Sequence, residues 1–524
     1  MLFELSNDLT KLNLKEATRQ EIAQLKTTLN VYVTGYRFMP RFQKTRWDGK
    51  IDFFNNGCID FGLWNVVYEC CKQYGYPFNI SNRDAFPKDN SITLDDVAEF
   101  CEDFYKDHTD GKGGAFTPYD HQVEAVAAML KHKFCCIEVA TSGGKSLIFA
   151  TTLFYLLKKN PGFKFLLIVP SVSLVTQFYD DIMNYNLGFN NENTEPLDIR
   201  IMEVMSDKPR KNFSDNEPNV YIGTYQSLVN YGVPENQPDF YKQFDVLCID
   251  ESHKAKSVSI NTIVKRSFGY SSYRFGMSGT YQNPGSSELL SILSVTGPIV
   301  KVVKAKELMD KGLISNAKIK CMLVNHEDIE FANNVCIIKK HGNGKKAYDL
   351  ESEYIQKSEK RKLFLTKLVT RFDSNSLVLF HNIEYGTELY NFFRSNIQDK
   401  NFYYIDGATD SVKREYIKKQ MENTSGKPNI LVASYGTLST GVSIKALKYM
   451  IMAQPFKSNS LIRQSIGRLL RLHESKVDSK AVIFDIVDVF HYKYKTILYN
   501  QFLTRKNDIY KVQEFEFDET KVTL

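Results

Sequence analysis

The sequence predicts an α/β protein with two tandem domains, each built on a parallel sheet, and a small N-terminal α+β domain. The chain has 524 residues, and at about 150 residues per domain this length suggests several folding units. Short apolar runs alternate with helical patterns over most of the chain, and strands separated by helices are typical of parallel sheets. The first hundred or so residues lack this alternation.

The first parallel-sheet domain is expected over residues 113–302. Its predicted strands are the apolar runs at 133–140, 164–170, 219–224, 244–250 and 273–279. Each run is long enough for a strand buried on both faces and is followed by a helical or polar stretch.

The second parallel-sheet domain is expected over residues 361–494. Its predicted strands lie at 376–382, 401–407, 429–436, 449–454 and 480–488. We predict a connector at 303–360, a C-terminal extension of one helix and a short strand at 495–524, and an N-terminal domain at 1–112 that ends in a loop rich in Gly and Pro.

Composition excludes several classes of protein. Hydrophobic residues make up 43% and charged residues 24% of the chain, as in ordinary globular proteins. The net charge is only +6, so a nucleic-acid surface has to be local. Nine cysteines without a C-x-x-C pair exclude a disulfide framework or zinc module. No apolar run approaches membrane-spanning length, and we expect a soluble protein of a reducing compartment without membrane association.

A Gly-rich loop, VATSGGKS at 139–146, joins a predicted strand to a predicted helix. Backbone N–H groups at such a turn bind phosphate. Lys145 would reach the β- and γ-phosphates of ATP, and the Ser146 hydroxyl would bind Mg²⁺. The residues expected to bind the nucleotide here are Thr141, Ser142, Gly143, Gly144, Lys145 and Ser146.

Two acids, Asp250 and Glu251, end the apolar run at 244–250. A carboxylate leaving a buried strand needs a partner, because an unpaired buried charge is costly. Asp250 is expected to hold Mg²⁺, and Glu251 to orient or deprotonate the water that attacks the γ-phosphate. A helix N-cap is the alternative, but it explains one acid and not its combination with a phosphate loop.

Two arginines follow in the second domain, in the segment QSIGRLLR at 464–471. On a helix, Arg468 and Arg471 would share one face. Their guanidinium groups could neutralise charge on the transferred phosphoryl group, as arginine fingers do. Gln464 lies one turn earlier on the same face. The alternative is a solvated basic stripe.

The combination of the GKS loop with Asp-Glu-Ser-His at 250–253 resembles superfamily 2 helicases and translocases. The resemblance implies two RecA-like domains that use ATP and Mg²⁺ and hydrolyse ATP when they close on each other. It also implies adenine contacts by Tyr119 and Gln122, coupling of hydrolysis to domain motion by Ser278 and Thr280, and nucleic-acid contacts by Thr224, Thr437 and Thr440. The family's fifth motif usually ends in Asp, and this chain has Ser443 there.

A second cluster of cations and aromatics lies at 31–54. The cations expected to hold DNA phosphates are Arg37, Arg41, Lys44 and Arg46. Phe38, Phe42 and Trp47 are expected to form the small core of the N-terminal domain. The alternative for the cations is a merely solvated surface.

The segment GYRFMPRFQKTRWDGK at 35–50 resembles the N-terminal domain of UvsW-type phage helicases. That resemblance implies ATP-driven unwinding and branch migration of branched, forked, single- and double-stranded DNA in replication, recombination and repair. It also implies 3′ to 5′ translocation, and we expect a monomer in the host cytoplasm.

Three alternative functions stay open. The first is an RNA helicase, against which the lack of an RNA-binding signature argues. The second is a duplex translocase that does not separate strands. The third is a nonhydrolysing junction-binding scaffold, against which the intact Lys145, Glu251, Arg468 and Arg471 argue.

Overall fold

The computed structural model describes most of the chain. The described residues are 1–109, 114–188, 195–205, 217–231, 240–254, 258–267, 269–281, 285–439, 444–454, 456, 458–476 and 480–524. They form two compact units, residues 1–139 with 144–303, and residues 304–524 with 140–143. None of the described helices is both long enough and apolar enough to cross a bilayer.

A seven-stranded parallel sheet forms the centre of the first unit, in the order β10-β11-β9-β12-β13-β8-β14. Its strands are β8 (Phe134–Val139), β9 (Phe165–Val169), β10 (Ile201–Val204), β11 (Val220–Thr224), β12 (Val246–Asp250), β13 (Tyr273–Ser278) and β14 (Ile299–Val303). All five predicted strands are confirmed. The two that the sequence analysis missed, β10 and β14, are the edge strands, whose side chains are only partly buried.

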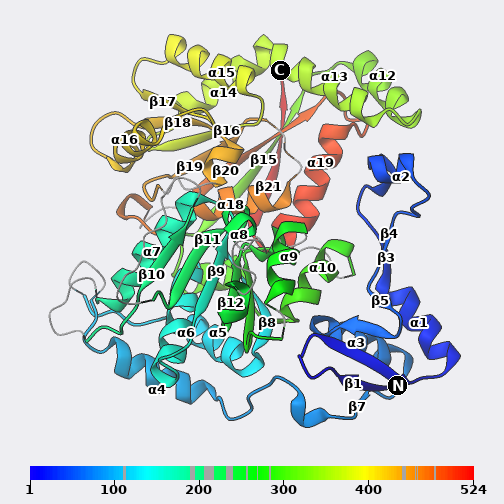
Figure 1. Ribbon diagram of the computed structural model, residues 1–524. Helices are drawn as coiled ribbons and strands as arrows, with labels where there is room; N and C mark the ends of the chain where they lie inside the picture. The colour runs from blue at the N-terminus through cyan, green and yellow to red at the C-terminus, as the bar shows by residue number, and fades with distance from the viewer. Residues whose placement is uncertain are drawn as a thin grey trace. The chain divides into compact units, whose positions relative to one another are not determined.

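Helices cover both faces of this sheet (Figure 1). One face is covered by α5 (Asp120–His132), α6 (Lys145–Lys159) and α7 (Val172–Asn186), with α4 (Leu94–Tyr105) beside α5. The other face carries α8 (Tyr225–Tyr231), α9 (Val258–Arg266) and α10 (Ser287–Thr296), whose apolar side chains join the core. Because both faces are covered, the strands are almost wholly apolar.

The N-terminal domain is α+β, as predicted. Its mixed sheet has the order β5-β6-β2-β1-β7. The strands are β1 (Leu2–Leu5), β2 (Lys11–Glu16), β5 (Phe54–Asn55), β6 (Cys58–Asp60) and β7 (Asn79–Ile80), and the main helices are α1 (Arg19–Leu29) and α3 (Trp64–Tyr74).

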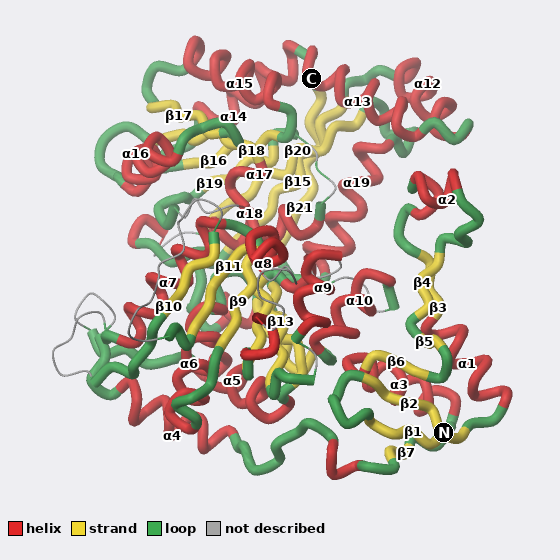
Figure 2. The backbone as a smooth tube through the Cα atoms, viewed as in Figure 1, coloured by secondary structure: helices red, strands yellow, loops and turns green. Residues whose placement is uncertain are grey.

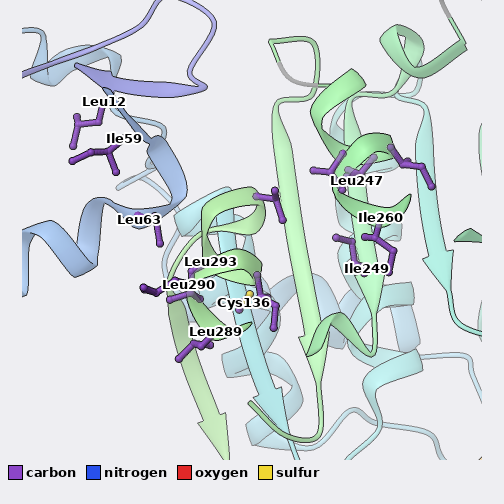
Figure 3. Packing of buried hydrophobic residues seen from close by; sticks show 14 of the residues in the cluster. Leu12, Ile59, Leu63, Cys136, Leu247, Ile249, Ile260, Leu289, Leu290 and Leu293 are labelled. Carbon is purple, nitrogen blue, oxygen red and sulfur yellow. The ribbon is translucent and has the colours of Figure 1, made fainter. Parts of the chain in front are cut away.

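This N-terminal domain packs tightly on the first parallel sheet, within the same unit. Leu12, Ile59 and Leu63 belong to one apolar cluster with Leu290 and Leu293 of α10 (Figure 3). Gly62 fits against the α10 backbone so closely that a Cβ there would overlap the carbonyl oxygen of Leu293.

A buried arginine adds a polar link between the N-terminal domain and the sheet. Arg274 of β13 donates to the backbone oxygen of Leu9 at 3.0 Å, and its guanidinium lies 3.8 Å from the ring centroid of Phe134. The N-terminal domain and the first sheet therefore form one folded body.

A narrow arm extends from the N-terminal domain (Figures 1 and 2). The antiparallel pair β3 (Asn30–Tyr32) and β4 (Lys50–Asp52) carries at its tip the short helix α2 (Pro40–Lys44). Tyr36 stacks on Tyr32 with 4.9 Å between centroids, and Gly49, with φ of 85°, leaves room for the Tyr36 ring. The arm therefore has a small aromatic support of its own.

The second unit is also built on seven parallel strands, in the order β17-β18-β16-β19-β20-β15-β21. They are β15 (Ala317–Asn325), β16 (Ser376–Phe380), β17 (Asn401–Ile405), β18 (Asn429–Ser434), β19 (Tyr449–Met452), β20 (Ala481–Val489) and β21 (Glu516–Thr523). The five predicted strands are again confirmed. The unit's helices are α11 (Ala305–Asp310), α12 (Ile329–Lys340), α13 (Gly344–Lys357), α14 (Glu359–Thr370), α15 (Ile383–Asn396), α16 (Ser411–Glu422), α17 (Tyr435–Ser439), α18 (Asn459–Leu469) and α19 (Ile497–Arg505).

Two assignments made from the sequence need correction here. Residues 303–360 are not a connector, because they supply β15 and the helices α12 and α13 to the second unit. Residues 495–524 form a helix and a strand as expected, but they are part of the same fold, since β21 pairs with β15 along its length. The strand β15, AKIKCMLVN, alternates between buried and half-buried positions, so it does not appear among the continuous apolar runs from which the strands were predicted.

Candidate functional site

Three of the predicted functional segments meet at one edge of the first sheet. The Gly-rich loop follows β8, Asp250 and Glu251 end β12, and Ser278 ends β13. In the sheet β13 lies between β12 and β8. Because all three strands are parallel, their carboxyl ends lie side by side, which is where ligands bind in open α/β sheets.

The Gly-rich loop turns directly into α6, with Gly144 as its N-cap at φ of 82°. The left-handed backbone of Gly144 favours glycine, and a Cβ there would also force the side-chain amide of Gln122 to shift. Ser142 also has a left-handed backbone, with φ of 71°. The first-turn N–H groups of α6 therefore border a loop shaped to admit an anion.

Gln122 and Tyr119, the predicted adenine contacts, lie at the N-terminus of α5. The buried Gln122 accepts the backbone N–H of Tyr119 at 2.9 Å, and its amide packs against Gly144. The Tyr119 side chain is half exposed and stacks on His121. The structure thus brings Gln122 to the phosphate loop and leaves Tyr119 at the surface.

Lys145 and Glu251 form an ion pair across the edge of the sheet. Lys145 Nζ lies 3.8 Å from Glu251 Oε1, and both side chains are mostly buried. Burial by itself would raise the pKa of Glu251, but the charge of Lys145 and the hydrogen bond from His253 outweigh it and lower the pKa below the usual value. Glu251 is therefore ionised at neutral pH and can accept a proton.

Asp250 is almost fully buried, and its Oδ1 has no hydrogen-bond partner among the described residues. Burial, and then the charge of Glu251, raise the pKa of Asp250. An orphaned buried carboxylate oxygen at the phosphate edge has the chemistry of a Mg²⁺ ligand, because Mg²⁺ takes one or two protein oxygens together with phosphate oxygens. Asp250 therefore fits the predicted metal position.

The second predicted Mg²⁺ ligand, Ser146, begins the helix α6 beside Lys145. Its hydroxyl forms a hydrogen bond with Tyr185 of α7, and burial raises the pKa of Tyr185 to about 12. Tyr185 was not among the residues predicted from the sequence. No motif marks it, because only the packing of α7 brings it to the loop.

His253 connects the acids to the predicted coupling segment. Its Nδ1 lies 3.1 Å from Glu251 Oε2 and 3.0 Å from Ser278 Oγ. A carboxylate can only accept, and the Ser278 hydroxyl donates to the backbone oxygen of Thr280 at 2.8 Å. Nδ1 therefore carries the proton. The sequence marked His253 as part of a motif without giving it this role.

In the second unit, α18 carries Gln464 and Arg468 one turn apart, both partly buried. The prediction for Arg471 is wrong in one respect. The helix ends at Leu469, so Arg471 lies beyond its C-cap and does not share a helical face with Arg468. The backbone oxygen of Arg471 instead accepts the hydroxyl of Ser315 at 3.1 Å.

The threonines predicted to contact DNA lie at the ends of β11 and β18. Thr224 is buried, and its hydroxyl donates to Ser227 at 2.9 Å in the first turn of α8. Thr437 is buried too, with Ser434 Oγ 2.7 Å from its hydroxyl. Both hydroxyls therefore bond within their own turns, which leaves little side-chain surface for DNA. Thr440 and Ser443 lie outside the described residues.

The four cations predicted to hold phosphates, Arg37, Arg41, Lys44 and Arg46, all lie on the arm with exposed side chains. Arg37 lies 5.7 Å from the Tyr36 ring centroid and Arg41 5.0 Å from that of Trp47. Within the described part of the chain, none of the four forms an ion pair with an acid.

The aromatics of this segment do not form the core of the N-terminal domain, contrary to the prediction. Phe42 and Trp47 are only half-buried and pack on the arm itself, Phe42 edge-on to Tyr36 at 4.9 Å. The core consists instead of aliphatic residues and phenylalanines from the sheet, α1 and α3, such as Phe3, Leu25 and Val67. The Phe38 side chain lies outside the described part.

Comparisons with known proteins agree with this arrangement. Three family models match in succession: "DNA helicase UvsW, N-terminal" at residues 7–81, "Type III restriction enzyme, res subunit" at 115–283, and "Helicase conserved C-terminal domain" at 359–473. Among solved structures, the ATP-dependent type ISP restriction-modification enzyme LlaBIII bound to DNA matches with a TM-score of 0.57 at 15% identity, over 78% of this chain and 32% of that one. This match shows the fold.

Two relatives with assigned activities match by sequence. DNA 3′-5′ translocase XPB2 of Sulfurisphaera tokodaii is 26% identical over 393 residues, 70% of this chain and 81% of that protein. ATP-dependent DNA helicase uvsW of Enterobacteria phage T4 is 30% identical over 483 residues, 91% of this chain and 88% of that protein. The chain belongs to the UvsW family of ATP-dependent DNA helicases.

Proposed function

We propose that the protein uses ATP hydrolysis to unwind and branch-migrate branched DNA such as forks and Holliday junctions. The observation that carries the proposal is the arm, which exposes cations that form no ion pair with an acid of the described residues and which belongs to the same folded unit as β8, β12 and β13. Cations on an arm suit contacts to the DNA backbone, which position a duplex without reading its sequence.

We propose that ATP binds where the loop after β8 meets the ends of β12 and β13. The phosphates replace Glu251 as the partner of Lys145, and Glu251 is then free to accept a proton from the attacking water. Mg²⁺, held by Asp250 and Ser146, would neutralise charge on the phosphates. Gln122 and the backbone N–H groups of the Gly-rich loop would orient ATP.

The contact between His253 and Ser278 supports a route for coupling. A change in the charge around Glu251 alters the hydrogen bond that His253 donates. Because His253 also contacts the Ser278 hydroxyl, which accepts the backbone N–H of Thr280, the change reaches the end of β13. We propose that hydrolysis acts on the DNA-binding surface through this chain of hydrogen bonds.

The arginines of the second unit complete the proposed ATPase. Arg468, with Gln464 one turn before it, would stabilise charge on the γ-phosphoryl group when the two units close. Arg471 keeps a proposed role in the same step, although it extends from the chain beyond the helix.

We further propose that the protein acts as a monomer in the cytoplasm of a phage-infected cell and moves 3′ to 5′. The relatives support the location and the direction of movement, since one is a phage T4 helicase and another is named a 3′-5′ translocase.

Four substrates test the proposal when assayed beside ATP hydrolysis. Forks and Holliday junctions with homologous arms should be resolved only with ATP, whereas the Glu251→Gln variant should resolve neither. An RNA duplex should be left intact. Displacement of a triplex strand without resolution of forks would instead identify a duplex translocase, and the absence of ATP hydrolysis on any DNA would identify a scaffold.

A further inference from the structure

A helical hairpin in the second unit ends in a concentration of positive charge. The helices α12 and α13 run antiparallel beside each other and are joined by a short loop (Figures 1 and 2). At the turn, the sequence reads KKHGNGKK, and Lys339, Lys340, His341, Lys345 and Lys346 are all exposed. We name these five residues the basic tip.

Among the described residues, the lysines of the basic tip form no ion pair with an acid, although the charge of Lys339 favours the ionised form of Glu351 at longer range. Within the described residues no carboxylate forms an ion pair with any of the four, and Lys339 Nζ only donates to the backbone oxygen of Lys495 at 3.4 Å. Asp349, one turn along α13 from Lys345, forms no ion pair with it. Glu353 pairs instead with Lys357 at the far end of α13.

The hairpin is fixed rigidly to α19, so the basic tip is held in place. The Glu351 carboxylate is fully buried and accepts the backbone N–H groups of Ile497 and Leu498, both at 2.9 Å. This carboxylate thereby satisfies two of the N–H groups that the first turn of α19 leaves without helical partners. An apolar cluster that joins Ala332 of α12 and Ile355 of α13 with Leu498 packs the hairpin on α19.

A favourable interaction with the helix dipole explains only some of the lysines of the basic tip. Lys339 and Lys340 lie in the last turn of α12, where positive charge is favourable. Lys345 and Lys346 lie in the first turn of α13, where it is unfavourable, and that turn contains no acid. Lys339 also contacts the backbone of Lys495, which belongs to a separate segment with two exposed lysines, Lys493 and Lys495.

We propose that the basic tip is a second DNA-contact surface, which holds the sugar-phosphate backbone of a duplex on the second unit. Lysine ammonium groups act as adaptable point charges, so they suit phosphates in any sequence. Since the arm lies on the first unit, the basic tip gives each of the two units a backbone contact of its own. The inference needs only the DNA helicase activity of the family, and it goes beyond the proposed branch migration.

The test replaces the four lysines of the basic tip with Gln and measures affinity for a short DNA duplex over a salt series, without ATP. Each phosphate contact contributes about 0.9 to the slope of log affinity against log salt, so the slope should fall by about two to four. The matched control changes four other exposed lysines of the second unit, Lys360, Lys367, Lys413 and Lys419, and should leave the slope almost unchanged. The corresponding Lys→Arg variant of the basic tip should keep the wild-type slope.

Two further readouts complete the experiment. ATP hydrolysis without DNA should be equal in all variants, while DNA-stimulated hydrolysis in the Gln variant should need several-fold more DNA. An unchanged slope in the folded Gln variant would overturn the inference, and so would a loss confined to RNA duplexes. Failure of the wild-type protein to migrate junctions would refute the proposed function and leave this measurement intact.

Discussion

Lys145 and Glu251 lie 3.8 Å apart, from Nζ to Oε1, although about a hundred residues separate them in the sequence. The lysine begins the helix after β8 and the acid follows β12, and β13 with Ser278 lies between the two strands. One parallel sheet thus places Lys145, Glu251 and Ser278, the proposed phosphate-binding cation, proton acceptor and coupling residue, at a single edge. Glu251 holds this position with a left-handed backbone, φ of 50°, which a non-glycine residue adopts at a cost of about 1 kcal/mol or more.

The first prediction concerns Glu251. In the Glu251→Gln variant, kcat for ATP hydrolysis should fall by about 10²- to 10⁴-fold, because an amide cannot accept the proton of the attacking water. Binding of a fluorescent ATP analogue should persist, since Asp250 and Lys145 remain. Lys145→Ala should weaken that binding as well. Near-normal turnover in Glu251→Gln would show that another group is the base.

The second prediction concerns Arg468 on α18. Changing it to Ala should slow DNA-stimulated ATP hydrolysis by about 10³-fold, as expected for removal of an arginine finger, with a smaller change in ATP affinity. Arg394→Ala on the exposed surface of α15 is the matched control and should have no effect. The Arg471→Ala variant, measured in parallel, shows whether an arginine beyond the helix end contributes too. Wild-type rates in both arginine variants would contradict the proposed closure of the two units.

The third prediction concerns the arm. Changing Arg37, Arg41 and Arg46 together to Ala should lower the salt slope of junction binding by about three charges' worth, because three phosphate contacts are lost. ATP hydrolysis without DNA should be unchanged. The control is a triple variant of Arg19, Lys26 and Lys72, which are exposed on α1 and α3 of the same domain. If both triple variants have the wild-type slope and the wild-type circular dichroism spectrum, the arm is only a solvated surface.

The fourth prediction concerns Gly62, which packs on α10. Gly62→Ala should destabilise the first unit by about 1–3 kcal/mol, because the added methyl group overlaps the backbone of Leu293. Gly162→Ala is the control, since no atom of the described residues lies near its Cβ position. Urea unfolding monitored by circular dichroism gives both values. Equal midpoints would mean that the N-terminal domain is not packed against the sheet.

The fifth prediction concerns the buried pair Arg361 and Asp488, with Arg361 Nε 2.7 Å from Asp488 Oδ1. Burial alone would raise the pKa of Asp488, but Arg361 and His326 lower it below the ordinary value of an aspartate. Arg361→Met leaves Asp488 buried without its main partner and should cost about 3–5 kcal/mol at pH 7.

The pH dependence of this pair has a definite sign. Because the folded pKa of Asp488 lies below the unfolded value, its stabilising contribution is complete above the unfolded pKa and is lost as the pH falls through the folded one. The difference in stability between wild type and Arg361→Met should therefore narrow as the pH is lowered from 7 toward 4 and below. Urea titrations at several pH values measure this difference in stability. A difference that stays constant with pH would refute the role of Arg361 as the main partner of Asp488.

The sequence alone was sufficient to predict the two parallel sheets and the sheet edge that carries the Gly-rich loop. Ten apolar runs identified the central strands, because a strand buried on both faces has to be apolar throughout. Gly144 and Lys145 were recognisable because the chemistry of a phosphate turn permits few residue types at those positions. Asp250 and Glu251 were recognisable because a carboxylate that ends a buried strand needs a partner.

Only the tertiary structure decided the remaining features. The edge strand β10 and the strand β15 have mixed polarity, so neither appears in the sequence as a continuous apolar run. The helix that carries Arg468 ends at Leu469, two residues before Arg471, and no residue in QSIGRLLR marks that end.

The same holds for the contacts between distant segments. Tyr185 reaches Ser146, and the hairpin of α12 and α13 is held by Glu351, only because helices far apart in the sequence pack together. Local sequence determines which segments form strands, helices and phosphate turns, since these depend on near neighbours. The partner of each buried polar group depends on long-range packing, which the sequence pattern does not specify.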